Sequence, residues 1–192
     1  MEKKDLKPAG VFKYFEEICQ VPRPSKKEEK MIAYLKAFGA KHNLETKVDE
    51  AGNVLIKKPA TPGKENLQTV VLQSHIDMVC EKNNDVQHDF LTDPIETEID
   101  GEWLKAKGTT LGADNGIGVA TELAILADDS IEHGPLECLF TVDEETGLTG
   151  AFALQEGFMS GDILLNLDSE DEGEIFIGCA GGIDSVAEFT YK

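Results

Sequence analysis

The chain has 192 residues, of which 41% are hydrophobic, so it can bury a substantial core and is not globally disordered. Its formal net charge of −19 repels phosphate backbones and argues against a nucleic-acid-binding protein. It has no run of about 18 apolar residues and no apolar N-terminal signal, so we expect no membrane partner and a cytoplasmic location.

The cysteines are widely spaced and include no C-x-x-C pair: Cys19, Cys80, Cys138 and Cys179. This spacing predicts neither a disulfide framework nor a structural zinc knuckle. Several of these residues lie in apolar runs, where a reduced cysteine serves as a small hydrophobic side chain.

Helices are predicted at the N-terminal end of the chain. Ser25 followed by Glu28 matches a capping box, and the apolar residues after it have helical spacing, which predicts a helix over 26–42. A shorter helix is expected over 11–19, before the break at Pro22 and Pro24.

Strands and helices then alternate along the chain. A hairpin is expected from strands at 46–49 and 53–57, and a second hairpin with an Asp-Gly turn over 98–104. Short apolar runs predict strands buried on both faces at 69–72, 136–142 and 163–167. Further helices are expected at 117–127 and 148–154. This alternation predicts an α/β sandwich.

A histidine and an aspartate directly follow the predicted strand at 69–72. In an extended chain His75 and Asp77 point to the same face, so the carboxylate can hold one ring nitrogen while the other binds a metal. The same H-x-D spacing also occurs in incidental polar pairs, and by itself it leaves both interpretations open.

Asp114 lies in the glycine-rich segment TLGADNGIG, at the start of a predicted helix. The segment lacks the lysine of a phosphate-binding loop and the G-x-G-x-x-G pattern. Small neighbours would allow Asp114 to be shared between two cations, but an aspartate that caps the helix explains the segment equally well.

Three more carboxylates come at the ends of predicted strands: Glu144, Glu145 and Asp168. Open α/β sheets bind ligands beyond the carboxyl ends of their strands. One imidazole among several oxygen ligands suits zinc, manganese or cobalt, and two such ions about 3.5–4 Å apart typically serve hydrolysis. The other histidines, His42, His88 and His133, match no ligand pattern.

Four motifs in this order carry a family resemblance: SHIDMV, TLGADNGIG, DEETGLTGA and NLDSE. The chain resembles the di-zinc aminopeptidase, carboxypeptidase and aminoacylase superfamily, and within it the aminoacyl-histidine (Xaa-His) dipeptidases. The resemblance implies a three-layer α/β/α sandwich with a mixed, mostly parallel sheet. It implies hydrolysis of dipeptides, such as β-alanyl-histidine, by a water that two zinc ions activate, with Co²⁺ or Mn²⁺ as substitutes.

The resemblance also implies a role for each residue. His75 and Asp168 would bind one zinc, Asp114 would bridge both ions, and Glu145 would bind the second. Asp77 would orient the His75 ring, and Glu144 would act as the general base.

Family members complete the second zinc site with a histidine near the end of a much longer chain, and they insert a lid or dimerisation domain. We therefore expect residues 1–183 to be the N-terminal part of the catalytic domain and 184–192 to begin a truncated lid. Such a fragment would hold one zinc well, a second weakly, and would be weakly active or inactive. The complete protein would form a homodimer.

Two alternatives stay open. One is another amide hydrolase of the same superfamily, either a tripeptide aminopeptidase or an N-acyl amino-acid deacylase. The other is a non-catalytic acidic module that binds Ca²⁺, although the chain lacks an EF-hand loop and this alternative leaves the placement of His75 and Asp114 unexplained.

Overall fold

The fold centres on a five-stranded sheet. The computed structural model describes residues 2–169, 171, 173–182 and 185–191. In spatial order the strands are β1 (Glu45–Val48), β2 (Val54–Lys58), β6 (Leu136–Thr141), β3 (Val70–His75) and β7 (Ile163–Asn166). β2 is antiparallel to both β1 and β6, whereas β3 is parallel to both β6 and β7. Four strands therefore point the same way, and the expected mixed, mostly parallel sheet is confirmed.

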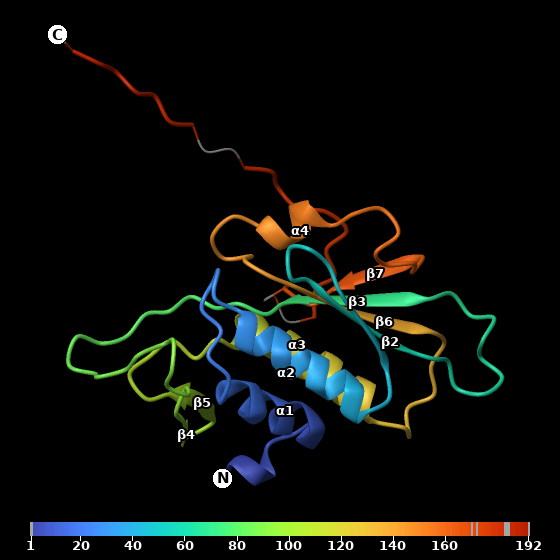
Figure 1. The fold of residues 1–192 in the computed structure, drawn as a ribbon. Helices are drawn as coiled ribbons and strands as arrows, with labels where there is room; N and C mark the ends of the chain where they lie inside the picture. Colours follow the sequence, from blue (N-terminus) through green and yellow to red (C-terminus); the bar gives the residue numbers. More distant parts are fainter. Residues whose placement is uncertain (1, 170, 172, 183–184, 192) are drawn as a thin grey trace.

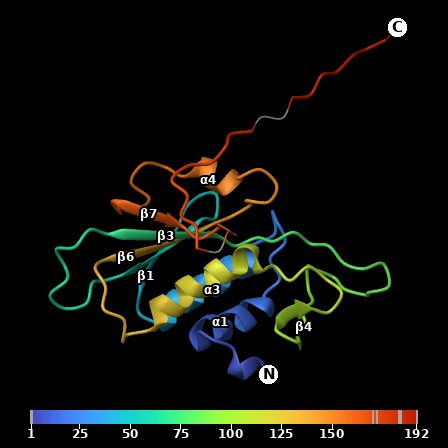
Figure 2. The same cartoon turned by 180° about the vertical axis from the view of Figure 1, so that it is seen from behind.

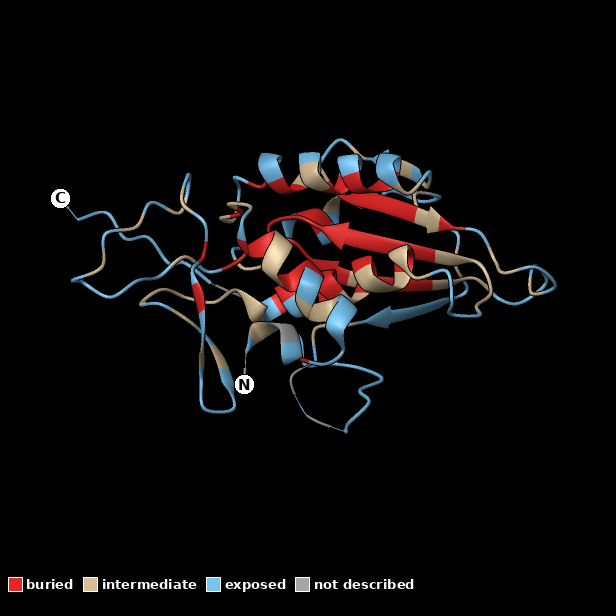
Figure 3. Ribbon diagram, turned by 90° about the horizontal axis from the view of Figure 1, so that it is seen from below, coloured by how far each residue is buried: buried red, intermediate tan, exposed pale blue. Residues whose placement is uncertain are grey.

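Three helices cover one face of this sheet: α1 (Ala9–Cys19), α2 (Glu29–Lys41) and α3 (Ala113–Ala127) (Figures 1 and 2). Their apolar sides meet the sheet in one continuous core, which contains Phe15, Met31, Leu35, Leu123 and Phe140. The central strands are buried along most of their length (Figure 3). Apolar burial on this face supplies most of the favourable free energy of folding.

The opposite face carries much less cover. A five-residue helix, α4 (Thr149–Ala153), lies over it together with the loop that leads to β7 (Figure 1). Leu154, Phe158 and Met159 pack there against a small cluster of Leu55, Val71 and Leu139. All four residues of β7 are exposed, so the expectation that this strand is buried on both faces is wrong.

A separate two-stranded hairpin projects from one end of the molecule. It consists of β4 (Thr97–Asp100) and β5 (Trp103–Ala106), and its turn contains Gly101 with φ of 63°. The expected Asp-Gly turn is confirmed. A short 3-10 helix, η1 (Lys3–Asp5), precedes α1.

The capping box expected at Ser25 and Glu28 is wrong. Lys26 has φ of 65°, which is not helical, and the helix begins three residues later than expected, at Glu29. The Ser25 hydroxyl instead donates to Oδ2 of Asp77 at 2.7 Å. Ser25, which looks like a helix cap, therefore holds a distant carboxylate instead.

Two further expectations concern the chain as a whole. None of the described helices is both long and apolar enough to cross a membrane. The predicted boundary between 183 and 184 falls on residues outside the described ranges, so the domain division stays a prediction.

Candidate metal centre

The predicted site residues meet at the carboxyl edge of the sheet. His75 is the last residue of β3, Asp114 lies in the first turn of α3, and Asp168 follows β7. From Nε2 of His75, Oδ1 of Asp114 lies 3.0 Å away and Oδ1 of Asp168 3.6 Å away. Oε2 of Glu144, which follows β6, lies 4.0 Å from the same nitrogen. Residues far apart in sequence thus surround one ring nitrogen.

The ligand atoms form two overlapping groups. His75, Asp114 and Asp168 each offer one ligand atom within 4.8 Å of the others, and so do His75, Glu144 and Glu145. No lysine or arginine within the described residues forms an ion pair with these carboxylates. Carboxylate oxygens with one imidazole, and without a protein counter-charge, suit a divalent cation of the zinc, manganese or cobalt type. The residues therefore fit a metal.

The electrostatics of the metal-free centre agree with this fit. Burial raises the pKa of Glu144, and the negative charges of Asp168, Asp77 and Asp114 raise it further. Burial and the charge of Asp114 likewise raise the pKa of Glu145. Repulsion among carboxylates disfavours their charged forms, and a bound cation reverses this effect.

Asp77 holds the His75 ring from behind. Its Oδ1 lies 3.2 Å from Nδ1 of His75, and the Asp77 side chain is fully buried. The backbone amides of Glu144 and Glu145 also donate to its carboxylate, at 3.0 and 3.2 Å. Burial opposes ionisation, but these bonds and that from Ser25 lower the pKa of Asp77 to about 2. One carboxylate thus aligns β3 with the turn after β6.

Asp114 does not cap α3. The N-cap residue is Gly112, no side chain caps this end, and Asp114 has non-helical backbone angles. The peptide bond between Asp114 and Asn115 is cis. Nδ2 of Asn115 donates to the backbone oxygen of Leu167 at 3.0 Å and to the carboxylate of Asp168. Asn115 therefore ties α3 to β7, a role that no sequence pattern indicated.

A tight turn presents Glu144 and Glu145. Asp143 has φ of 49°, and its carboxylate accepts hydrogen bonds from the hydroxyls of Thr146 and Thr149, each at 2.5 Å. Glu28 accepts from the Asp143 amide at 3.0 Å. Glu28, Asp77 and Asp143 lie close enough together to hold a cation, but amides and hydroxyls already occupy their oxygens. We assign this buried cluster a structural role.

The other histidines lie away from the centre, as expected. The His42 ring stacks on Phe38, His88 contacts the Phe90 ring, and Nδ1 of His133 lies 2.7 Å from the oxygen of Gly134. None belongs to a ligand group within the part of the chain that the structure describes.

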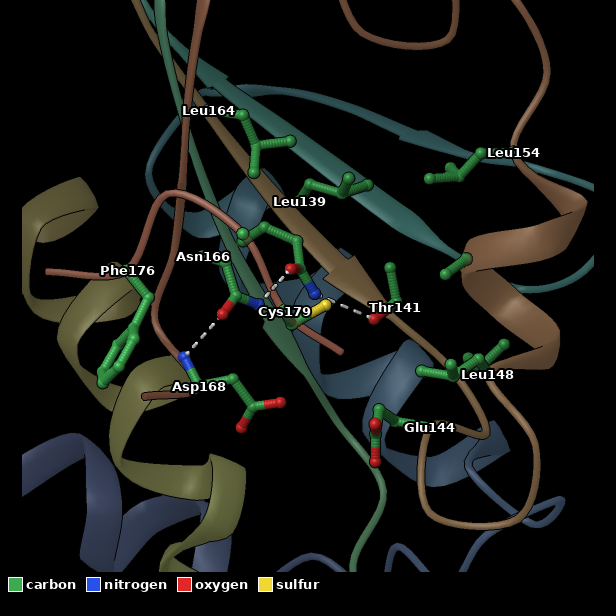
Figure 4. A pocket seen from close by; sticks show the side chains of 14 residues that line it. Leu139, Thr141, Glu144, Leu148, Leu154, Leu164, Asn166, Asp168, Phe176 and Cys179 are labelled. Carbon is green, nitrogen blue, oxygen red and sulfur yellow. Dashed lines mark hydrogen bonds between the residues drawn. The ribbon is translucent and has the colours of Figure 1, made fainter. Parts of the chain in front are cut away.

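A cavity of about 590 Å³ opens beside the centre, on the thinly covered face of the sheet. Apolar side chains form much of its wall, and Glu144 and Asp168 also line it (Figure 4). An amide chain crosses its floor: Asn166 donates to Gln73 at 2.7 Å, and Gln73 donates to Thr141 at 3.2 Å. The amide of Asp168 donates to Asn166 at 3.2 Å, so this polar chain reaches the centre.

The sequence of this chain matches a known protein family. Residues 71–188 match the model of peptidase family M20/M25/M40. The chain belongs to this family. Peptidases of the family are metal-dependent, in agreement with the ligand groups found here.

Individual relatives support the assignment. The chain is 54% identical over 183 residues to the cytosol non-specific dipeptidase of Escherichia coli (strain K12), covering 95% of this chain and 38% of the relative. The crystal structure of aminoacylhistidine dipeptidase from Vibrio alginolyticus is 56% identical, with a TM-score of 0.87 over 90% of this chain and 35% of that one. The predicted resemblance to aminoacyl-histidine dipeptidases is thereby confirmed.

More distant structures share the fold. Aminopeptidase PepT from Bacillus cereus is 26% identical, with a TM-score of 0.72 over 84% of this chain and 43% of that one. A tripeptidase from Staphylococcus aureus is 23% identical, with a TM-score of 0.71 over 84% of this chain and 43% of that one. At this identity the likeness concerns the fold alone. The chain spans 35–43% of the length of these four relatives.

Proposed function

We propose that this chain is the metal-binding part of a dipeptidase that hydrolyses the peptide bond of small peptides with a C-terminal histidine. The convergence of Asp114, Asp168 and Glu144 on Nε2 of His75 carries the proposal. The names of two relatives, a non-specific dipeptidase and an aminoacylhistidine dipeptidase, point to the substrate class. The name of the former relative also supports a cytoplasmic location.

The proposed ligands are those expected from the sequence. His75 and Asp168 would hold one zinc ion, Asp114 would be shared with a second ion, and Glu145 would hold that second ion. The short distances from His75 to Asp114 and Asp168 support the first ligand group. When bound, the ions supply positive charge that acidifies a nearby water and polarises the scissile carbonyl. Co²⁺ and Mn²⁺ suit the same ligands.

Glu144 is the proposed general base. Its carboxylate accepts a proton from the attacking water as the new C–O bond forms, and donates that proton to the amine nitrogen as the C–N bond breaks. Its carboxylate lies beside the candidate ligands, with Oε2 4.0 Å from Nε2 of His75, where it can reach a water at the centre. Asp77 keeps the His75 ring in the orientation that leaves Nε2 free for the metal.

Counting zinc tests the metal centre. After dialysis, elemental analysis of the wild-type chain should give about one zinc per chain. We expect the ion to stay bound because the first ligand group offers one imidazole and two carboxylates. Asp114→Ala should lose it, whereas Glu98→Ala, on the exposed accessory hairpin, should keep it. A folded wild-type chain with no zinc would contradict the proposal.

A substrate panel tests the reaction. Glycyl-histidine and β-alanyl-histidine should be hydrolysed faster than tripeptides or N-acylated amino acids, and Glu144→Gln should abolish turnover. Preference for either of the other substrates would favour the tripeptide aminopeptidase or deacylase alternative. A calcium-binding module predicts no hydrolysis and dependence on Ca²⁺. The chain spans 38% of the length of the E. coli relative, and we expect its own turnover to be low. As a separate proposal, based on the family resemblance, the complete protein forms a homodimer.

A further inference from the structure

The chain contains a single arginine, and it is buried. Arg23 is 3% exposed, whereas the remaining 17 of its 18 basic residues are lysines. Two prolines bracket it, Pro22 and Pro24. Arginine is mostly found at protein surfaces, so a fully buried one needs hydrogen-bond partners that compensate for its desolvation.

The Arg23 guanidinium joins two segments that carry candidate metal ligands. Nη1 donates to the backbone oxygens of Ile76 and Asp77, at 3.1 and 3.0 Å, just after the end of β3. Nη2 donates to the backbone oxygen of Gly112 at 2.5 Å, two residues before Asp114. One planar group therefore spans the strand end that presents His75 and the loop that presents Asp114.

Two glycines make room for this group. A Cβ atom at Gly112 would lie 2.6 Å from Nη2 of Arg23, and one at Gly116 would lie 2.7 Å from it. Real Cβ atoms essentially never approach so closely. Gly112 also has φ of 68°, where a side chain is strained. The glycine-rich sequence around Asp114 is thus shaped around the guanidinium.

Arg23 forms no ion pair with a carboxylate of the described residues, and its three acceptors are all backbone oxygens. Burial lowers the pKa of Arg23, while the negative charges of Asp77 and Asp114 favour its protonated form. Arginine stays protonated in proteins. Arg23 therefore provides a fixed positive charge behind an acidic centre, without blocking any candidate ligand oxygen.

We propose that Arg23 is a positioning residue that sets the spacing between His75 and Asp114 before a metal binds. This inference rests on the proposed function. The planar fork with donors in fixed directions is essential to it, because a lysine ammonium presents one point charge and cannot reach three carbonyls on two segments in this geometry. Arg23→Lys should therefore fail as a substitute although it keeps the charge.

Hydrogen exchange of the metal-free chain measures the clamp directly. In Arg23→Lys, the amides of residues 109–116 should exchange about tenfold faster or more, since the loop loses its tie to β3. Lys58→Met is the matched control: Lys58 is also buried, and it donates to the backbone oxygens of Ile125 and Asp128, at the opposite end of α3. This variant should speed exchange near 125–129 and leave 109–116 unchanged.

Titration with Co²⁺, followed by absorbance, measures the consequence for the centre. Affinity should fall about 10–100-fold in Arg23→Lys, the range typical of residues that orient metal ligands, and stay within a factor of three in Lys58→Met. Gly116→Ala, whose methyl group would crowd Nη2 of Arg23 most closely and the Phe15 ring less closely, should show a smaller loss in the same direction. If Arg23→Lys does not fold, Gly116→Ala tests the same inference.

The outcomes separate the two proposals. A wild-type chain that binds no Co²⁺ would overturn the proposed function together with the role of Arg23. A wild-type chain that binds Co²⁺, with Arg23→Lys and Gly116→Ala unchanged in both exchange and affinity, would overturn the role of Arg23 alone. Faster exchange at 109–116 combined with weaker Co²⁺ binding supports it.

Discussion

The two sides of the metal centre are built differently. On the β3 side, His75 and Asp77 are almost fully buried and several hydrogen bonds fix Asp77. On the β7 side, the Asp168 side chain is 26% exposed and the strand that leads to it is exposed at every residue. Asn115 and the pair of Gln73 with Asn166 hold this side.

This difference indicates which candidate ligands the fold positions before any metal binds. A buried candidate ligand that is held by hydrogen bonds keeps its place without a metal, and this describes His75. A ligand on a thinly packed strand gains more order when a cation arrives, because the metal adds contacts that the protein lacks there. We therefore expect metal binding to stabilise the β7 side more than the β3 side.

The largest expected effect comes from removing the carboxylate on the buried side. Asp77→Ala leaves two amides, a hydroxyl and the His75 ring without their acceptor, and should lower the free energy of unfolding by about 3–5 kcal/mol. Asp168→Ala, on the exposed side, should cost below about 1 kcal/mol. Urea unfolding of both variants with a chelator present measures this, and equal costs would contradict the comparison.

The pH dependence of the metal-free chain should follow the His75 ring. Burial alone would lower its pKa, but the hydrogen bond to Asp77, the charge of Asp168 and the hydrogen bond to Asp114 raise it to about 9. Stability from this shift is fully present below the unfolded pKa of about 6.5 and is lost as the pH rises through about 9, a change of about 3 kcal/mol. Urea unfolding at pH 6 and pH 10 should show a clearly smaller loss in His75→Gln than in the wild type.

The buried carboxyl group of Glu122 should also make the chain less stable as the pH rises, with a smaller effect than His75. Glu122, on α3, is fully buried, and neither of its carboxylate oxygens has a hydrogen-bond partner among the described residues. Burial, opposed in part by the nearby Ser74 and Cys138, raises its pKa well above the usual value.

Below pH 4.5 Glu122 is protonated in both the folded and the unfolded chain. As the pH rises above 4.5, the unfolded chain releases this proton first, so the folded chain loses stability until the pH reaches the folded pKa. Glu122→Gln should therefore match the wild type near pH 4.5 and be about 1–3 kcal/mol more stable at pH 8, as measured by urea unfolding. Glu98→Gln, on the exposed hairpin, should change nothing at either pH. A destabilised Glu122→Gln variant at pH 8 would show that the carboxylate has a partner.

The smallest expected effect lies on the exposed strand. Leu165 is 49% exposed, so Leu165→Thr should change the free energy of unfolding by at most about 0.5 kcal/mol. Leu139, at 1% exposure in the central strand β6 and on the opposite face of the sheet, provides the control, and Leu139→Thr should cost several times more. Similar losses in both variants would mean that β7 is better packed than its exposure indicates.

The sequence was sufficient for much of the fold because the strongest periodic patterns are local. The helix of α1, the two hairpins and the strands β3 and β6 follow from patterns within a few residues. The burial of β7 could not be predicted this way: its apolar sequence resembles that of β3, but only β3 has a strand on either side and helices above it. Burial depends on neighbours, which periodicity does not specify.

The site divides in the same way. His75 and Asp168 were conspicuous as a histidine and a carboxylate at strand ends, whereas a metal role for Asp114, at a helix start, came from the family resemblance. The structure brings the three side chains together. Asn115 and Arg23 were missed, since each acts through partners at least 50 residues away in sequence. Ser25 was misassigned because its local pattern satisfied a helix cap while its hydroxyl bonds a residue 52 positions away.

The outer edge of β7 has a consequence for how the molecule behaves in solution. Within the described residues β7 is the last strand of the sheet, and Ile163, Leu164 and Leu165 are exposed along it. The opposite edge strand, β1, carries the charged Glu45 and Lys47. An open apolar edge is a template for strand addition between molecules, and charged residues are what blunt it. The net charge of −19 keeps copies apart at low ionic strength, but at 0.1 M salt charges more than about 10 Å apart are screened. Salt should therefore drive this chain toward self-association and precipitation, the reverse of its usual effect on proteins that attract one another through opposite charges.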